Sequence, residues 1–258
     1  MHTIEVVNGI LVRRLGLDAG KKLLCLHGFA DSGLAFLPLS ETVLPGCFEL
    51  VLVDLPGFGA SPSIPGFGLV RDHGRLVPGL AAALAPDEPV GLIGHSIGSA
   101  IAVNAADLLS PAPLGVFSIE GNLTEDDAYF SGKAADWEDG EAFKAAFLEE
   151  IWEKAAENVD LRRYYGGVVM AGAAAMWTLG RDAKRISAGN RVGQAYQALK
   201  VPSLYYWCEA TTPPGTRQYI EDYSIPNRRY PAASHWPMIA DPQATARAVV
   251  EFFNRLAG

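Results

Sequence analysis

Residues 89–106 read PVGLIGHSIGSAIAVNAA, and the rest of the chain can be interpreted outward from this stretch. An apolar run ends in the pentapeptide Gly-His-Ser-Ile-Gly at 94–98, and a run of small, helix-compatible residues follows. A sharp turn between a strand and a helix has room only for small residues, so Gly94 and Gly98 allow the two elements to pass close together. Such a turn holds Ser96 in a strained backbone conformation and lifts its hydroxyl to the top of a sheet. The stretch therefore predicts a strand, a nucleophile elbow and a helix.

Strand-like and helix-like segments alternate on both sides of the elbow. Short apolar runs predict strands at 22–26, 49–53, 114–119, 202–208 and 227–230, and residues 3–13 predict an edge strand or hairpin. Helical patterns fall at 34–44, 69–84, 216–223 and 242–256. Continuous apolar strands that alternate with helices indicate a parallel sheet covered on both faces. The predicted fold class is therefore α/β.

Residues 122–198 differ from the rest of the chain because they contain no convincing strand. They are rich in Ala, Glu, Lys and Trp at helical spacing. Phe143, Phe147, Ile151 and Trp152 form an i, i+4, i+8, i+9 stripe, which is more typical of core packing than of a cofactor site. We expect this segment to be a helical insertion.

Composition limits the classes of function. With 258 residues, 49% of them hydrophobic, the chain can bury one large core with an inserted lid. The net charge is −8 without a sizeable basic cluster, so nucleic acid is not an expected partner. The N-terminus resembles no signal peptide, and no apolar run is long enough to span a membrane, so we expect a cytoplasmic protein without membrane attachment.

The three cysteines do not have the spacing of a metal site. Cys25 and Cys208 stand in apolar, strand-like runs, so we expect them to be buried free thiols, as suits a reduced cytoplasm. We expect neither a metal nor an organic cofactor.

Four motifs together resemble the α/β-hydrolase family. They are the His-Gly pair at 27–28 after a strand, the segment DLPGFGAS at 54–61, the elbow around Ser96, and the late His235. The resemblance covers about 1–120 and 200–258. It implies a mostly parallel sheet of eight strands with a lid inserted after the sixth. The implied division is a core domain of 1–121 and 199–258, with a helical cap at 122–198.

The resemblance also implies a histidine base and an oxyanion hole. His235, in a loop after the last expected strand and before a Trp-Pro pair, is the best candidate for the base that takes the serine proton. His2, His27, His73 and His95 fit less well, because they lie at a chain end, in the His-Gly motif, on a helix and in the elbow. The backbone amides of Phe29 and Ile97 are expected to hold the oxyanion. Asp54 is expected to be structural.

The acidic member of the triad is where this chain departs from the commonest family pattern. Residues 208–212 read CEATT, and Thr211 stands where an aspartate is usual. Some family members, haloalkane dehalogenases among them, carry the acid after the sixth strand, where this chain has Glu120. We expect Glu120 to be the acid. Glu209, and Asp126 or Asp127, remain alternatives, and so does the absence of any acid.

These residues predict a serine hydrolase that cleaves carboxyl esters or lactones through an acyl-enzyme. The same machinery acting on a carbon–carbon, amide or thioester bond, or forming a peracid, is an alternative, and a non-hydrolytic receptor on the same fold is another. A dehalogenase is disfavoured, because its nucleophile would be an aspartate where this chain has Ser96.

An apolar small-molecule ester or lactone, with large-ring lactones in range, is the expected substrate. The expected substrate-binding residues are Phe29, His95, Trp177 and Trp236. Further apolar side chains for the lid come from Trp152, Tyr164, Tyr165, Met170 and Met176. Arg162 and Arg163 are expected to lie on a solvated helix face.

Overall fold

The computed structural model describes residues 2–17, 20–231 and 233–256, and its centre is a sheet of eight strands. The spatial order is β1-β2-β4-β3-β5-β6-β7-β8. The strands are β1 (His2–Val7), β2 (Ile10–Gly16), β3 (Lys22–Leu26), β4 (Glu49–Val53), β5 (Gly91–His95), β6 (Gly115–Ile119), β7 (Ser203–Trp207) and β8 (Asn227–Arg229). The α/β class and the eight-stranded, mostly parallel sheet are thereby confirmed.

Strand direction follows from how the strands are connected. β1 and β2 form an antiparallel hairpin through Asn8 and Gly9, both of which have positive φ, as a tight hairpin turn requires. β2 also pairs antiparallel with β4, and every later pairing is parallel. The central strands β3 to β6 are buried along their whole length, as their continuous apolar sequence predicts.

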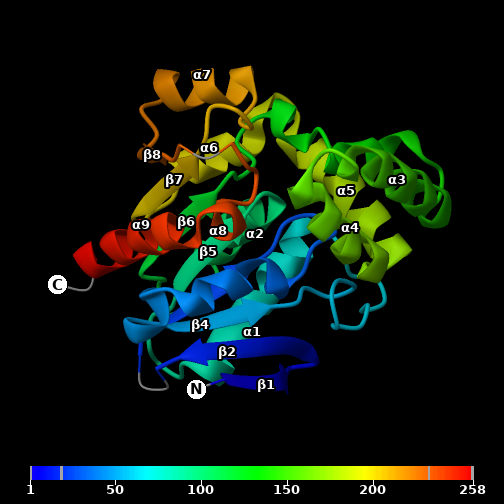
Figure 1. The fold of residues 1–258 in the computed structure, drawn as a ribbon. Coiled ribbons are helices and arrows are strands. Elements are labelled where there is room, and N and C mark those ends of the chain that lie inside the picture. The colour runs from blue at the N-terminus through cyan, green and yellow to red at the C-terminus, as the bar shows by residue number, and fades with distance from the viewer. Residues whose placement is uncertain (1, 18–19, 232, 257–258) are drawn as a thin grey trace.

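Helices cover the sheet and extend beyond one end of it (Figure 1). The core helices are α1 (Val70–Leu84), α2 (Ile97–Ala106), α7 (Pro214–Asp222), α8 (Pro237–Ala240) and α9 (Pro242–Arg255). The expected helix at 34–44 is instead a 3₁₀ helix, Gly33–Glu41, followed by a short second one, Leu44–Gly46. Pro38 lies inside the first and lacks the amide hydrogen that a regular α-helix needs.

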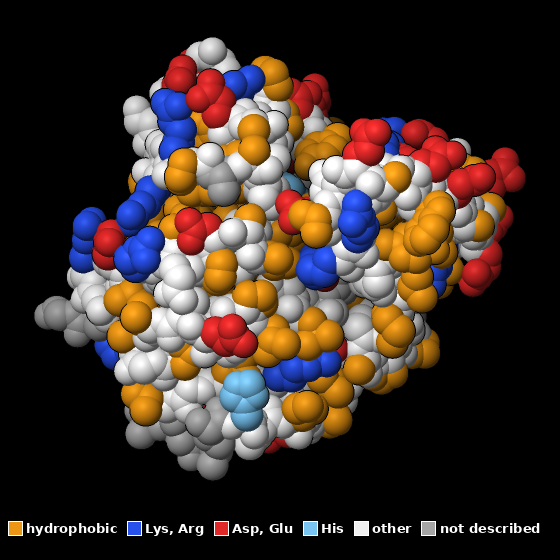
Figure 2. Space-filling view, viewed as in Figure 1, with side chains coloured by type: hydrophobic (Ala, Val, Ile, Leu, Met, Phe, Trp, Pro, Cys, Tyr) orange, Lys and Arg blue, Asp and Glu red, His pale blue; other side chains and the backbone are white. Residues whose placement is uncertain are grey.

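Residues 122–198, the helical segment, contain no strand. The segment's helices are α3 (Gly140–Ala155), α4 (Val159–Met170), α5 (Ala173–Ser187) and α6 (Arg191–Gln197). Side chains cap the first turn of two of these helices. Asp139 accepts a hydrogen bond from the Ala142 amide of α3, and Asn158 accepts from the Asp160 and Leu161 amides of α4. α3, α4 and α5 form the bulge at one end of the molecule (Figure 1), and acidic side chains gather over its outer surface (Figure 2).

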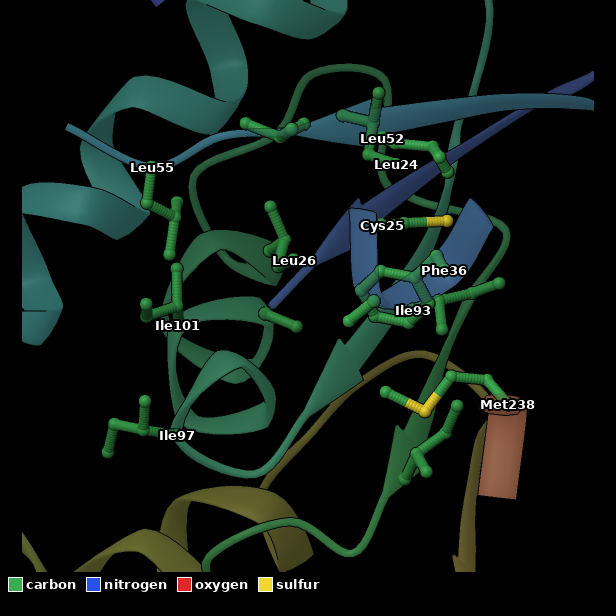
Figure 3. Packing of buried hydrophobic residues seen from close by; sticks show 14 of the residues in the cluster. Leu24, Cys25, Leu26, Phe36, Leu52, Leu55, Ile93, Ile97, Ile101 and Met238 are labelled. Atoms are coloured by element: carbon green, nitrogen blue, oxygen red, sulfur yellow. The ribbon is translucent and has the colours of Figure 1, made fainter. Parts of the chain in front are cut away.

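The main hydrophobic core lies between the sheet and its helices, where the side chains of β3, β5 and α2 pack together (Figure 3). Cys25 and Cys208 are buried free thiols, as predicted. The stripe on α3 is core for Phe143, Phe147 and Ile151, but Trp152 is 66% exposed, so its expected place in the core is wrong. A step from i+8 to i+9 turns the side chain by about 100°, which carries Trp152 around to the solvent side.

Within residues 2–17, 20–231 and 233–256, no helix combines the length and the apolar character that crossing a membrane requires.

Candidate active site

Ser96 occupies the turn between β5 and α2 with φ 51° and ψ −126°. Its amide donates to the Ile119 carbonyl at 2.9 Å, which fixes the turn against β6. A side chain at Gly98 would place its Cβ 2.2 Å from the Leu26 carbonyl oxygen, and one at Gly94 would lie 2.5 Å from the Ser99 Cα. The glycines are therefore required by close backbone approach, and the serine stands at the carboxyl end of the parallel strands.

His235 and Glu120 meet at the same edge of the sheet. Glu120 follows β6, His235 lies in the loop between β8 and α8, and His235 Nδ1 is 3.4 Å from Glu120 Oε2. The distance is longer than a typical charged hydrogen bond. Both His235 and Ser96 border one cavity, and no hydrogen bond joins their side chains in the part of the chain that the structure describes. Catalytic hydrogen bonds are often long before a substrate is bound.

The Glu120 carboxylate is almost completely buried and has several donors around it. Oε1 accepts from the Cys208 amide at 2.6 Å, and Oε2 accepts from the Thr211 hydroxyl at 2.7 Å. Longer contacts of 3.3 Å and 3.5 Å come from the hydroxyls of Thr212 and Tyr230. A buried carboxylate needs such donors to replace lost water, so the turn after β7 holds the acid that β6 supplies.

The other candidate acids make no contact with His235, although Asp127 also lines the cavity beside Ser96. Glu209 is exposed and pairs with Arg217 and Arg229. Asp126 is exposed, while Asp127 accepts hydrogen bonds from the turn at Leu123 and Thr124 and from the Thr216 hydroxyl. Burial raises the pKa of Asp127 to about 6. Among the candidate acids, only Glu120 contacts His235.

Three residues around the site share an uncommon backbone conformation. Ala30, Ser96 and Glu120 have φ of 52°, 51° and 46°, although none of them is glycine. Positive φ costs free energy in residues with a Cβ and tends to persist where function requires it. Ile97 is the first residue of α2, so its amide has no acceptor four residues earlier in the helix. Phe29, the other expected oxyanion donor, immediately precedes the strained Ala30.

His27 and Asp54 both make contacts that hold neighbouring loops together. The His27 ring contacts the Gly28 carbonyl at 2.8 Å and accepts from the Leu55 amide at 3.0 Å, which ties the loops after β3 and β4 together. Burial lowers the pKa of His27. Asp54 is fully buried, pairs with Arg13 at 2.8 Å and accepts two backbone amides.

His95 lines the cavity, but its Nε2 already has a hydrogen-bond partner in the backbone. It lies 2.8 Å from the His235 carbonyl oxygen, so Nε2 carries the proton and donates. Burial, and then the neighbouring His235, lower the pKa of His95 well below its ordinary value. The neutral ring thus supports the loop that carries His235.

The cavity beside Ser96 has a volume of only about 20 Å³. That is room for about one water molecule. Aromatic side chains make up much of its wall: Phe29, Tyr129, Phe130, Tyr164 and Trp236.

Two expectations about the helical segment fail. Trp177 does not line this cavity; its Nε1 donates to the Trp137 carbonyl and Arg181 stacks on its ring beside a separate surface hollow. Arg163 is not on a solvated face, because it makes a two-pronged ion pair with Asp31, whose side chain is almost fully buried. Spacing along a helix shows which residues share a face, but it does not show which loop that face meets.

Sequence reasoning also missed the residues that surround the expected triad. In the sequence, Thr211 stands out only because an aspartate is usual there, and Tyr129 and Phe130 belong to no motif. Tyr230 and Ser234 support the loop of His235, and the Tyr230 hydroxyl donates to the Ser234 carbonyl. The two hydroxyls at 211–212, in a turn next to a strand that ends in a glutamate, are the sequence signal that could have indicated these donors to Glu120.

The chain belongs to the α/β-hydrolase family. The profile described as "Alpha/beta hydrolase family" matches residues 23–248, which includes every element that positions the site. The predicted resemblance is therefore confirmed.

Among curated relatives, protein phosphatase methylesterase 1 of Mus musculus is 35% identical over 108 residues, covering 39% of this chain and 28% of the relative. The matched segment thus spans less than a third of that relative's length. Two solved structures share the fold across nearly the whole chain. Esterase RhEst1 from Rhodococcus sp. ECU1013 has a TM-score of 0.75 at 19% identity and covers 99% of both chains. A mutant of the N-acyl homoserine lactonase AidH has a TM-score of 0.76 at 16% identity and covers 99% of this chain and 97% of its own.

Proposed function

We propose that this protein is a serine hydrolase that cleaves a carboxyl ester or lactone through an acyl-enzyme. Ser96 is the nucleophile, His235 the general base and acid, and Glu120 the residue that orients the imidazole. The Phe29 and Ile97 amides form the oxyanion hole. The contact between His235 Nδ1 and the buried Glu120 carboxylate is the observation that carries the proposal.

The reaction follows from these roles. His235 Nε2 takes the proton of Ser96 as its oxygen attacks the ester carbonyl, and the two amides stabilise the resulting oxyanion. The protonated imidazole then gives that proton to the leaving alkoxide, and the alcohol departs. Water attacks the acyl-enzyme with the same proton transfers, and this step releases the acid and regenerates Ser96. Glu120 stabilises the imidazolium that forms in each half of the reaction.

The helical segment acts as a lid in this proposal. A cavity of about 20 Å³ cannot hold an ester, so part of the lid must move before a substrate binds. The aromatic wall favours a small-molecule substrate with an apolar acyl or alcohol part. The similarity to a methylesterase, to the esterase RhEst1 and to a lactonase supports an ester or lactone bond as the target.

The receptor alternative rests on the missing aspartate at Thr211. It loses that support because Glu120 supplies a carboxylate to the same histidine. A binding protein has no need to bury this charge beside an imidazole, whereas a serine hydrolase does.

The test is hydrolysis of a panel of substrates by the wild type and by Ser96→Ala. The panel contains 4-nitrophenyl acetate, butyrate and octanoate, a simple methyl ester, and small-ring and large-ring lactones. A fluorophosphonate probe, which reacts with activated serines, is tested in parallel by mass spectrometry. We expect turnover and labelling in the wild type, and neither in Ser96→Ala at unchanged thermal stability. Equal turnover in both proteins, or a wild type that neither turns over nor takes the label, would exclude the serine mechanism.

A further inference from the structure

One face of helix α4 lies against both loops of the proposed active site. This face consists of residues at i, i+3, i+4 and i+7, namely Asp160, Arg163, Tyr164 and Gly167. Gly167 allows the closest approach: a Cβ at this position would lie 2.9 Å from the carbonyl oxygen of Ala30. The helix therefore packs directly on the loop that follows β3.

Two polar contacts join α4 to this loop, which carries the expected oxyanion donor. The Tyr164 hydroxyl donates to the Phe29 carbonyl at 2.8 Å. The Arg163 guanidinium donates to both carboxylate oxygens of Asp31, at 3.1 Å and 2.6 Å. A two-pronged pair of this kind fixes orientation as well as distance.

The same helix is joined to the loop of His235. The Ser234 hydroxyl donates to Asp160 Oδ2 at 2.5 Å, and its oxygen accepts from the Trp236 amide at 3.0 Å. The Trp236 indole Nε1 donates to Asp31 Oδ2 at 3.1 Å, and the Arg163 guanidinium lies 5.5 Å from the centre of the Trp236 ring. Asp31 thus connects α4 with Trp236, the residue after the proposed base.

We propose that Arg163 is a positioning residue: through Asp31 it holds the Phe29 loop and the His235 loop in one arrangement, and it does so only while α4 is seated. Removal of the guanidinium leaves the Asp31 carboxylate buried without its cation, so the carboxylate moves or takes up a proton. Either change releases the Trp236 indole and the backbone around Phe29. Because substrate entry requires the lid to move, reseating of α4 reassembles the site around a bound substrate. This inference rests on the proposed function.

Arg163→Gln tests the inference, and Arg162→Gln is the matched control. Arg162 is the preceding residue of the same helix, and it donates to the carbonyls of Ala155 and Ala156, away from the site. We expect Arg163→Gln to lower kcat about 10- to 100-fold at little-changed KM, because small misplacements of reacting groups have effects of that size. The rate of fluorophosphonate labelling falls in parallel. The kcat of Arg162→Gln stays within about threefold of wild type. Arg163→Lys keeps the charge but loses the two-pronged guanidinium contact, so its kcat lies between those of Arg163→Gln and the wild type.

A readout without catalysis separates this inference from the proposed function. In ¹⁵N-tryptophan-labelled protein, the indole resonance of Trp236, assigned with Trp236→Phe, shifts in Arg163→Gln and not in Arg162→Gln. An unmoved indole signal, or equal losses of kcat in both glutamine variants, would overturn the positioning role. A wild type that takes no label defeats the proposed function alone, because the indole shift still tests the contact. If Arg163→Gln does not fold, Arg163→Lys gives the same two measurements.

Discussion

The Thr211 hydroxyl donates a hydrogen bond to Glu120 Oε2 at 2.7 Å, across the space between the ends of β7 and β6. Thr211 stands where the family resemblance places an aspartate, so in this chain that turn supports an acid instead of supplying one. The Cys208 amide of the same turn donates to the other carboxylate oxygen. The negative charge remains beside His235, although a different strand carries it.

Glu120→Gln should lower kcat by about a thousandfold, with a smaller effect on KM. The amide keeps the shape of the side chain but lacks the charge that stabilises the imidazolium, and losses of roughly 10⁴ accompany the comparable change in serine proteases. Steady-state kinetics on the best ester of the panel provide the measurement. Glu209→Gln is the control, because that carboxylate is exposed and pairs only with surface arginines. Loss of activity in Glu209→Gln and not in Glu120→Gln would show that the acid is misassigned.

Moving the acid should restore part of the activity. Glu120→Ala removes the carboxylate that accepts from the Thr211 hydroxyl. The double variant Glu120→Ala/Thr211→Asp places a new carboxylate where that hydroxyl was. We expect the kcat of the double variant to be at least about tenfold higher than that of Glu120→Ala, because a carboxylate again faces the imidazole. Thr211→Asp alone should be less active than wild type, since two carboxylates would then share one site. A double variant no better than Glu120→Ala would mean that position 211 does not reach His235.

Gly98→Ala should destabilise the fold severely. The new Cβ would lie 2.2 Å from the Leu26 carbonyl oxygen, and both groups belong to backbone that cannot move independently. Overpacking of this kind costs about 3 kcal/mol or more, which corresponds to a Tm lower by roughly 6–12 °C. Gly166→Ala is the matched control: this glycine lies in α4 with no atom within 4 Å of a new Cβ, so the variant should be more stable by about 0.5–1 kcal/mol. Thermal unfolding followed by circular dichroism measures both, and equal Tm values would contradict the packing argument.

His73 should make the protein less stable as the pH falls. The ring is completely buried against Phe58 and Phe67, and neither nitrogen has a partner among the described residues. Burial lowers its pKa from 6.5 to about 4, so between these values the unfolded chain binds more protons than the folded one. The stability that this group contributes is complete above pH 6.5 and is lost as the pH falls towards 4. Linkage gives a loss of about 2 kcal/mol between pH 7 and pH 5.

Urea unfolding at pH 7 and pH 5 measures this loss, and His73→Leu should remove it. The contribution of Asp127 to stability changes with pH in the opposite direction. Its pKa is raised to about 6, so this contribution increases as the pH falls. The difference between wild type and His73→Leu isolates the histidine from that background. An identical pH dependence in the two proteins would mean that the ring has a partner or reaches solvent in solution.

Local patterns carried much of the fold. Strands β3 and β4 begin and end where the apolar runs predict, and the elbow follows from two glycines around a serine. These features depend on side-chain period and on steric limits within a few residues, so a short window of sequence contains the physical cause. The 3₁₀ helix at Gly33–Glu41 departs from the expected α-helix for an equally local reason, the proline inside it.

Long-range contacts settled what the patterns left open. Glu120 meets Thr211 from 91 positions away, and Arg163 meets Asp31 from 132 positions away. The position of Glu120 after a strand predicts an acid at that edge of the sheet, but nothing in the sequence near Glu120 or Arg163 shows which side chains each will contact. A buried charge is stable only where the folded chain brings donors or an opposite charge to it, and that meeting is a property of how the loops converge at the end of the sheet. Five consecutive residues at 94–98 therefore predict the proposed nucleophile, whereas Glu120 and Arg163 acquire their contacts only when distant segments pack together.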